Sequence, residues 1–394
     1  MKKIKEQYEK WIYPEPVMDM IAAINNGYSE HHDIPLYGNM FWHDKQTFDG
    51  LEILVAGCGT NSAAYNAIRN PTCRVTGIDI SQSSLDHERY LINKHKVQNL
   101  ELINLSIEHI ASLDKKFDYI LCSGVLHHLN DPEIGLRALN NVMKDDGVMC
   151  LMLYGETFRH GVYILQEVFR ELGLAQTEVD ITIAREIINS LPDWHGVKSY
   201  VKFTSELTND AAFVDTFLNP VDRAYSVDGV FDLISKSNLE FIGWQDPLHY
   251  DYRVVFPKLE PLHRLLQGKS DREKFAVVEK LSYSRGTHRF IVCKKNYAEI
   301  RIKPDPKKTF KTFYPKIKAG IKAIKPASLV TNENAILQRS RYKFEVSFIQ
   351  ARILEMCNGR NSVVDISNIL DVSLEETDRF IKDMYSFGHL LIRC

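Results

Sequence analysis

Two glycines and one aspartate stand at a spacing that suits the binding of a nucleoside. Residues 53–61 read ILVAGCGTN, an apolar strand that ends in a G-x-G turn. Glycine lets the backbone approach a ligand there because it has no Cβ and tolerates unusual φ and ψ angles. Asp79 follows Gly57 by 22 residues, and a carboxylate at about that distance can accept hydrogen bonds from both ribose hydroxyls of an adenosine ligand. The turn alone is a weak signal, because Ser62 replaces the last glycine of the dinucleotide fingerprint.

A third polar element follows a later apolar stretch. Residues 117–129 read FDYILCSGVLHHL, which predicts a buried strand that ends in small residues and bends into a histidine-rich helix. Because imidazole titrates near neutral pH, His127 and His128 are candidate catalytic bases, and Tyr154 is a candidate contact to the substrate. Packing explains each of these side chains at least as well. No set of His and carboxylate residues has the spacing of metal ligands, the pair His31-His32 included, so we expect no metal.

The elements that must position these residues alternate between strands and helices. An alternation of this kind is typical of a doubly wound, mostly parallel sheet that is covered on both faces. Two later strands are expected to pair antiparallel at one edge of the sheet. The expected strands cover residues 51–56, 74–80, 100–105, 119–123, 148–154, 239–244 and 288–294, with helices over 61–69, 85–96 and 132–143 and a mostly helical insertion over about 158–225.

In this order and spacing the three elements resemble the class I S-adenosylmethionine-dependent methyltransferase superfamily. The resemblance covers about residues 50–155 closely and extends more loosely to Lys294. It implies a seven-stranded Rossmann-like sheet and S-adenosyl-L-methionine as the cofactor. Two positions depart from the family pattern, because Val55 stands where an acidic residue often opens the first motif and Asn61 stands at the third glycine.

The resemblance also implies roles for individual residues. The glycine turn admits the cofactor, Asp79 holds its ribose, Ser106 and Ile107 lie at the adenine edge, and Ser123 and Gly124 face its methionine part. The N-terminal Tyr13 resembles aromatic residues that cover the cofactor in some of these enzymes. The full expected set of cofactor contacts is Tyr13, Ala56, Gly57, Cys58, Gly59, Asn61, Asp79, Ile80, Ser106, Ile107, Ser123, Gly124 and Val125.

The expected function is therefore methyl transfer by in-line displacement to an unidentified acceptor, with a protein or peptide side chain as the first choice. A small metabolite methylated on nitrogen or oxygen is an equal alternative. Two further hypotheses are an NAD(P)-dependent reductase, which uses a similar sheet and acidic ribose contact, and a non-catalytic scaffold that binds the cofactor.

Four regions are expected along the chain. Residues 1–49 are rich in aromatic residues and form either a packed segment or a lid over the ligand. Residues 50–296 form the methyltransferase domain with its insertion, and residues 297–335 form a basic linker in which a helix could follow Pro315. Residues 336–394 form a small helical module that resembles a winged helix.

Composition excludes several other classes of protein. The chain has 394 residues, 44% of them hydrophobic, and a net charge of −2, so no global field indicates a binder of nucleic acid or membrane surface. The helix over 374–380 is acidic, which disfavours DNA and favours a protein contact, so a homo-oligomer through the C-terminal module is expected. Scattered cysteines without a C-x-x-C pair and the lack of a signal peptide or membrane span predict a cytoplasmic protein.

Overall fold

The computed structural model describes residues 2–30, 33–45, 47–204, 208–283, 286–300, 309–318, 321–327 and 334–393. These residues form two compact units. Unit 1 comprises residues 1–32, 49–244 and 279–299, and unit 2 comprises residues 33–48, 245–278 and 300–394. In the described part of the chain, no helix combines the length and the apolar character that crossing a membrane requires.

Unit 1 is built on a seven-stranded sheet in the order β3-β2-β1-β4-β5-β7-β6. The first five strands run parallel, and β7 pairs antiparallel with both β5 and β6. This is the Rossmann-like, mostly parallel sheet that the alternating pattern predicts. The strands are β1 (Glu52–Ala56), β2 (Arg74–Asp79), β3 (Leu100–Asn104), β4 (Phe117–Ser123), β5 (Met143–Tyr154), β6 (Leu239–Trp244) and β7 (Thr287–Lys294).

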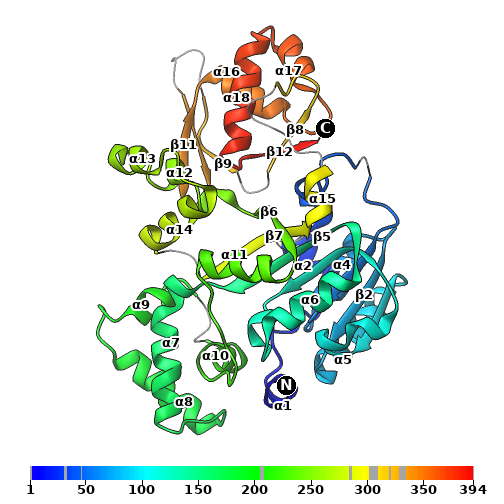
Figure 1. The fold of residues 1–394 in the computed structure, drawn as a ribbon, viewed down its shortest axis with the longest axis vertical. Coiled ribbons are helices and arrows are strands. Elements are labelled where there is room, and N and C mark those ends of the chain that lie inside the picture. Colours follow the sequence, from blue (N-terminus) through cyan, green and yellow to red (C-terminus); the bar gives the residue numbers. More distant parts are fainter. Residues whose placement is uncertain are drawn as a thin grey trace. The chain divides into compact units, whose positions relative to one another are not determined.

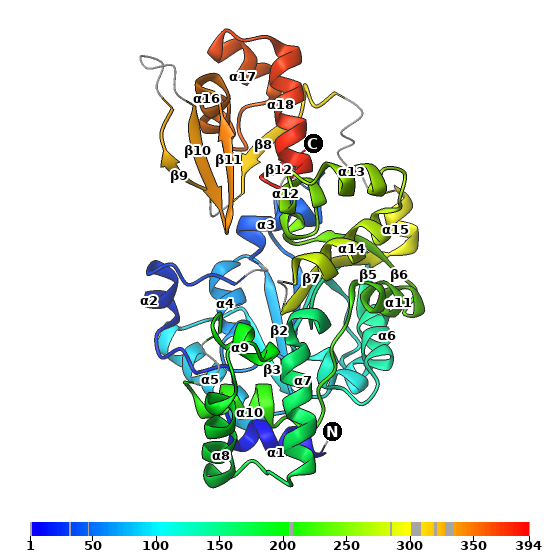
Figure 2. The same ribbon diagram turned by 90° about the vertical axis from the view of Figure 1, so that its left-hand side faces the viewer.

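Helices cover both faces of this sheet. Helices α4 and α5 pack together on one face, and α6 and α11 pack together on the other (Figure 2). A strand covered on both sides needs apolar residues throughout, and in β4 six of the seven residues are buried. The helices are α4 (Ser62–Arg69), α5 (Gln82–His95), α6 (Pro132–Val142) and α11 (Val227–Lys236), with the 3₁₀ turns η1 (Ile107–Leu113) and η2 (Leu126–His128).

The helical insertion and the N-terminal segment add further elements to unit 1. The insertion consists of α7 (Glu156–Glu171), α8 (Glu178–Ser190), α9 (Gly196–Val201) and α10 (Asp210–Phe217), which share an apolar core (Figure 1). The N-terminal segment holds two short helices, α1 (Lys2–Lys10) and α2 (Met20–Asn25), where the sequence predicts irregular structure. Helix α1 is held on α5, because the carboxylate of Glu9 accepts hydrogen bonds from the backbone of Gln82 and Ser83.

Unit 2 contains the C-terminal elements around an apolar core of its own. The predicted helical module holds the helices α16 (Phe348–Met356), α17 (Val363–Leu370) and α18 (Leu374–Ser386) and the strand β12 (Leu390–Arg393) (Figure 1). The winged-helix assignment stays a prediction. Unit 2 also holds α3 (Ile34–Phe41), η3 (Pro247–His249), α12 (Tyr252–Val255), α13 (Glu260–Leu266) and most of α14 (Asp271–Ser282); α15 (Lys295–Ile300) ends at its boundary with unit 1.

The helix predicted after Pro315 is wrong. Strand β8 (Tyr314–Ile317) pairs antiparallel with β12, and β9 (Ile321–Lys325) pairs with β10 (Ala335–Arg339), which pairs in turn with β11 (Tyr342–Val346). The physical reason is that so short a segment gains little from helix formation by itself, whereas partner strands satisfy its backbone hydrogen bonds. Residues 301–308 of the predicted basic linker, and His31 and His32, lie outside the described residues.

Candidate functional site

A cavity of about 470 Å³ opens at the carboxyl ends of the parallel strands of unit 1. Its lining includes the Gly57–Gly59 turn after β1, Asp79 at the end of β2, and Ser123, Gly124 and Val125 after β4. The parallel direction of these strands brings their ends to one edge of the sheet, where doubly wound proteins bind ligands. The volume lies within the usual range for pockets that hold a small molecule or a cofactor.

The turn after β1 can only be built from glycine. Gly57 has φ +72° and Gly59 has φ +56°, which is the left-handed region that disfavours other residues. A Cβ on Gly57 would lie 2.3 Å from Cγ2 of Val125, and one on Gly59 would lie 3.0 Å from Cδ of Pro14. The backbone of the turn is therefore held close to both neighbouring segments and exposed to the cavity.

Asp79 is fixed in place by the backbone around it. Its Oδ2 accepts a hydrogen bond of 2.8 Å from the Gly59 N–H, and its Oδ1 accepts one of 2.8 Å from the Ser81 N–H. Burial raises the pKa of this carboxyl, and these backbone hydrogen bonds oppose the rise. Each oxygen keeps a second lone pair, so the carboxylate can accept hydroxyl groups of a ligand from a preset position.

A second carboxylate, Asp215 of α10, also lines the cavity. Its Oδ1 accepts a hydrogen bond of 2.7 Å from the Tyr8 hydroxyl, and its Oδ2 accepts one of 3.0 Å from the Tyr154 hydroxyl. Nε2 of His128 lies 3.9 Å from Asp215 Oδ1. Burial first, and then the charge of Asp215, raises the pKa of both tyrosines well above its ordinary value, so both hydroxyls stay protonated donors.

The tautomer of His128 follows from its other ring nitrogen. Nδ1 lies 2.8 Å from the carbonyl oxygen of Val221 and must donate to it. In the neutral ring Nε2 is then the unprotonated nitrogen, and it is buried with no hydrogen-bond partner within the described residues. Other atoms of His128 line the cavity.

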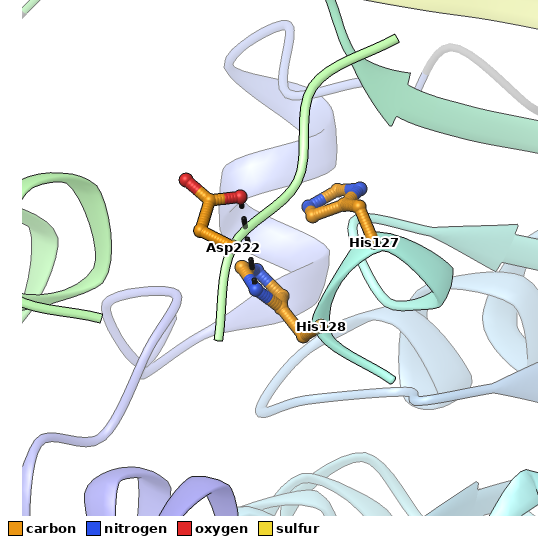
Figure 3. Close-up of side chains that lie close together, drawn as sticks. All are labelled: His127, His128 and Asp222. Carbon is orange, nitrogen blue, oxygen red and sulfur yellow. Dashed lines mark ion pairs between the residues drawn. The ribbon is translucent and has the colours of Figure 1, made fainter. Parts of the chain in front are cut away.

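His127, His128 and Asp222 form a close group, drawn in Figure 3. Their nearest ligand atoms lie within 4.8 Å of one another, which raises the question of a metal ion. The buried guanidinium of Arg159 lies 3.5 Å from Asp222 Oδ2, and a bound cation would be repelled by it. Burial, and then the charges of His128 and Arg159, lower the pKa of His127 well below its ordinary value. We therefore interpret the group as a buried polar network that supports His128.

The structure brings most of the predicted site residues to one cavity. The cavity is lined by Tyr13, Gly57, Cys58, Gly59, Asp79, Ile80, Ile107, Ser123, Gly124, Val125, His128 and Tyr154. Ala56, Asn61, Ser106 and His127 lie outside its lining. The Asn61 side chain instead accepts a hydrogen bond from the Val17 N–H and donates one to the Glu15 carbonyl, which ties the N-terminal segment to the turn.

Sequence reasoning missed the three charged residues Glu30, Asp215 and Arg289 of this lining, and polar residues such as Ser29, Ser84 and Thr287. None of them lies in a recognisable motif, so no sequence signal marks them. The sheet topology places β7 beside β5, and the insertion places α10 at the same edge.

The fold and the site define a doubly wound domain with a cavity at its strand ends. Residues 54–149 match the family described as "Methyltransferase domain". This part of the chain is therefore similar to a methyltransferase domain.

Parts of the chain are also similar to individual proteins. An uncharacterized protein of Synechococcus sp. is 30% identical over 239 residues, which is 58% of this chain and 57% of that protein. A ubiquinone biosynthesis O-methyltransferase of Neisseria meningitidis is 30% identical over 101 residues, which is 25% of this chain and 42% of that enzyme. The chain thus spans about half the length of the curated relatives that it matches.

One solved structure extends the likeness in fold to nearly the whole chain. PKMT2 from Rickettsia typhi, in complex with AdoHcy, superposes with a TM-score of 0.68 and 16% identity, covering 93% of this chain and 76% of that one. The likeness therefore includes regions beyond residues 54–149.

Proposed function

We propose that the protein is a methyltransferase that uses S-adenosyl-L-methionine. One observation carries the proposal. A single cavity is lined by the glycine turn, where a Cβ would collide with Val125 or Pro14, and by the fixed carboxylate of Asp79. When bound, S-adenosylmethionine supplies an electrophilic methyl group on a sulfonium, so the protein has mainly to position the acceptor in line and exclude water.

We assign cofactor binding to the lining residues after β1, β2 and β4. Asp79 holds the ribose hydroxyls, while Ile80 and Ile107 provide apolar contacts to the adenine. The backbone at Ser123 and Gly124 faces the methionine part, and Tyr13 covers the site.

The acceptor end of the cavity is assigned to Asp215 with Tyr8, Tyr154 and His128. The two tyrosine hydroxyls hold the Asp215 carboxylate in one orientation, and a carboxylate among aromatic rings suits a nucleophile that arrives as a cation. His128 Nε2 takes up the proton that such an acceptor must lose before attack. His127 has a supporting role, because it lies outside the cavity lining and its low pKa keeps it neutral.

We propose an amine of a protein or peptide side chain as the acceptor. A second folded unit of this size is more than a small acceptor requires. The alternative of a small metabolite is supported by Asp215, because the insertion that carries it closes one side of the cavity.

The test uses S-adenosylmethionine labelled in its methyl group, a cell extract, and wild-type protein beside Asp79→Ala. Label in acid-precipitable material that depends on Asp79 supports a macromolecular acceptor, and label only in the soluble fraction supports a metabolite. Cofactor binding without transfer to any fraction would favour the scaffold hypothesis. Oxidation of a nicotinamide cofactor, followed by its absorbance, would favour the reductase.

A further inference from the structure

Arg289 of β7 points a guanidinium into the same cavity, although β7 carries none of the sequence motifs. In the sheet register Ser123 lies beside Met152, and Met152 lies beside Arg289. Residues that are paired across neighbouring strands present their side chains on the same face, and all three of these line the cavity. Arg289 therefore belongs to the wall next to the Ser123–Gly124 turn.

Within the described residues, no hydrogen bond or ion pair joins the Arg289 side chain to another residue. Burial lowers its pKa to about 10, so it is still charged at neutral pH. A partly buried cation that the protein leaves unpaired is costly, and the five donors of a guanidinium match the two oxygens of a carboxylate.

Glu30 provides the opposite charge in the same cavity. Its carboxylate lines the cavity and is close enough to Arg289 to interact electrostatically. Its Oε1 accepts a hydrogen bond of 2.7 Å from the Ser62 hydroxyl, at the start of α4 just after the glycine turn. A fixed carboxylate and an unpaired guanidinium together complement a ligand group that carries both an ammonium and a carboxylate.

We propose that Arg289 binds the α-carboxylate, and Glu30 the α-ammonium, of the amino-acid end of the cofactor. The proposal rests on the proposed function, since it takes S-adenosylmethionine as the ligand. Asp79 holds the nucleoside end, and the clamp of Arg289 and Glu30 holds the other. Strand β7 and the N-terminal segment then contribute to cofactor affinity alongside the motifs after β1, β2 and β4.

The test compares two ligands that differ only at the amino-acid end. S-adenosylhomocysteine carries that end, whereas 5′-methylthioadenosine keeps the nucleoside and the sulfur but lacks it. Calorimetric titration of the full chain gives both dissociation constants for wild type, Arg289→Gln and Glu30→Gln. Arg89→Gln, an exposed arginine of α5 that pairs with Asp86, is the matched control.

We expect Arg289→Gln to weaken S-adenosylhomocysteine about 10- to 100-fold, the worth of a hydrogen bond to a charged group. Binding of 5′-methylthioadenosine should change less than twofold, and Arg89→Gln should bind both ligands as the wild type does. Arg289→Lys keeps the charge but cannot donate two parallel hydrogen bonds. Its affinity for S-adenosylhomocysteine should lie between those of the wild type and Arg289→Gln. Circular dichroism melting shows whether each variant is folded, and Arg289→Lys serves as the test if Arg289→Gln is not.

Three results would overturn the clamp. Equal losses for both ligands would mean that Arg289 acts on the shape of the cavity. Unchanged affinity for S-adenosylhomocysteine, with or without a higher KM for the acceptor, would mean that the cofactor carboxylate is not its ligand. Failure of the wild type to bind either nucleoside would refute the proposed function itself. This outcome differs from failure of the clamp alone, because it is seen without any variant.

Discussion

Replacing Asp79 by Asn is expected to weaken the binding of S-adenosylhomocysteine about tenfold while the protein stays folded. In the wild type, each carboxylate oxygen accepts one backbone N–H at 2.8 Å, from Gly59 and from Ser81. The amide of Asn has a single acceptor oxygen, so in either orientation its NH₂ group faces a backbone donor. The variant loses one bond to the backbone and one bond to the ribose.

The two losses act on different quantities. The ribose bond forms only on binding, and a hydrogen bond to a charged group is worth at least about 1.5 kcal/mol. Because about 1.4 kcal/mol corresponds to a factor of ten, the dissociation constant should rise about tenfold. The backbone bond is present with and without the ligand, so its loss should lower the free energy of unfolding by about 1.5 kcal/mol.

The assay is calorimetric titration with S-adenosylhomocysteine, together with urea unfolding of the same samples. Asp86→Asn is the control, because Asp86 is an exposed carboxylate on α5 in the same unit. If Asp79→Asn binds within threefold of the wild type and is equally stable, Asp79 does not hold the ribose.

Three further perturbations test the fold. Gly57→Ala should lower the free energy of unfolding by about 2 to 5 kcal/mol, because Gly57 has a positive φ and the new Cβ would lie 2.3 Å from Val125. Gly173→Ala is the control, because Gly173 has the same φ of +72° but open space around it. In urea unfolding it should lower the free energy by only about 1 to 2 kcal/mol. Arg159→Met should destabilise the protein by about 3 kcal/mol because it leaves the buried Asp222 carboxylate without its cation, and denaturant titration measures the loss. Burial lowers the pKa of Lys318 to about 7 from its ordinary 10.5. Between these two pKa values the unfolded state binds more protons than the folded state, so the free energy of unfolding should rise from pH 7 to pH 10. Urea titrations at both pH values measure this rise, and Lys318→Met should abolish it.

The sheet was predictable because buried parallel strands require continuous apolar runs. The expected strand over 239–244 matches β6, and those over 74–80, 100–105 and 288–294 agree with β2, β3 and β7 to within one residue at each end. Strand β5 begins at Met143, earlier than expected, because its polar first residues carry no apolar signal. The segment after Pro315 forms strands because pairing partners far along the chain decide its conformation.

Of the residues at the proposed acceptor end, the sequence singled out His128 and Tyr154 but not Asp215. Asp215 stands in a helix of ordinary pattern, 61 residues after Tyr154 and 207 after Tyr8, with which it forms hydrogen bonds. Such contacts depend on where α10 and α1 pack, and packing is a property of the whole apolar core of the insertion. His127 and His128 are adjacent in sequence, yet only His128 lines the cavity.

The sequence by itself determined where Gly57, Gly59 and Asp79 lie, at the proposed nucleoside end of the cavity. They follow or end two neighbouring parallel strands, and parallel strands bring their carboxyl ends to one edge of the sheet. Only the tertiary structure shows which charged residues line the cavity, because Glu30, Asp215 and Arg289 come from three separate segments of the chain. A charge at an isolated position carries no periodicity, so its role follows from what the fold places opposite it.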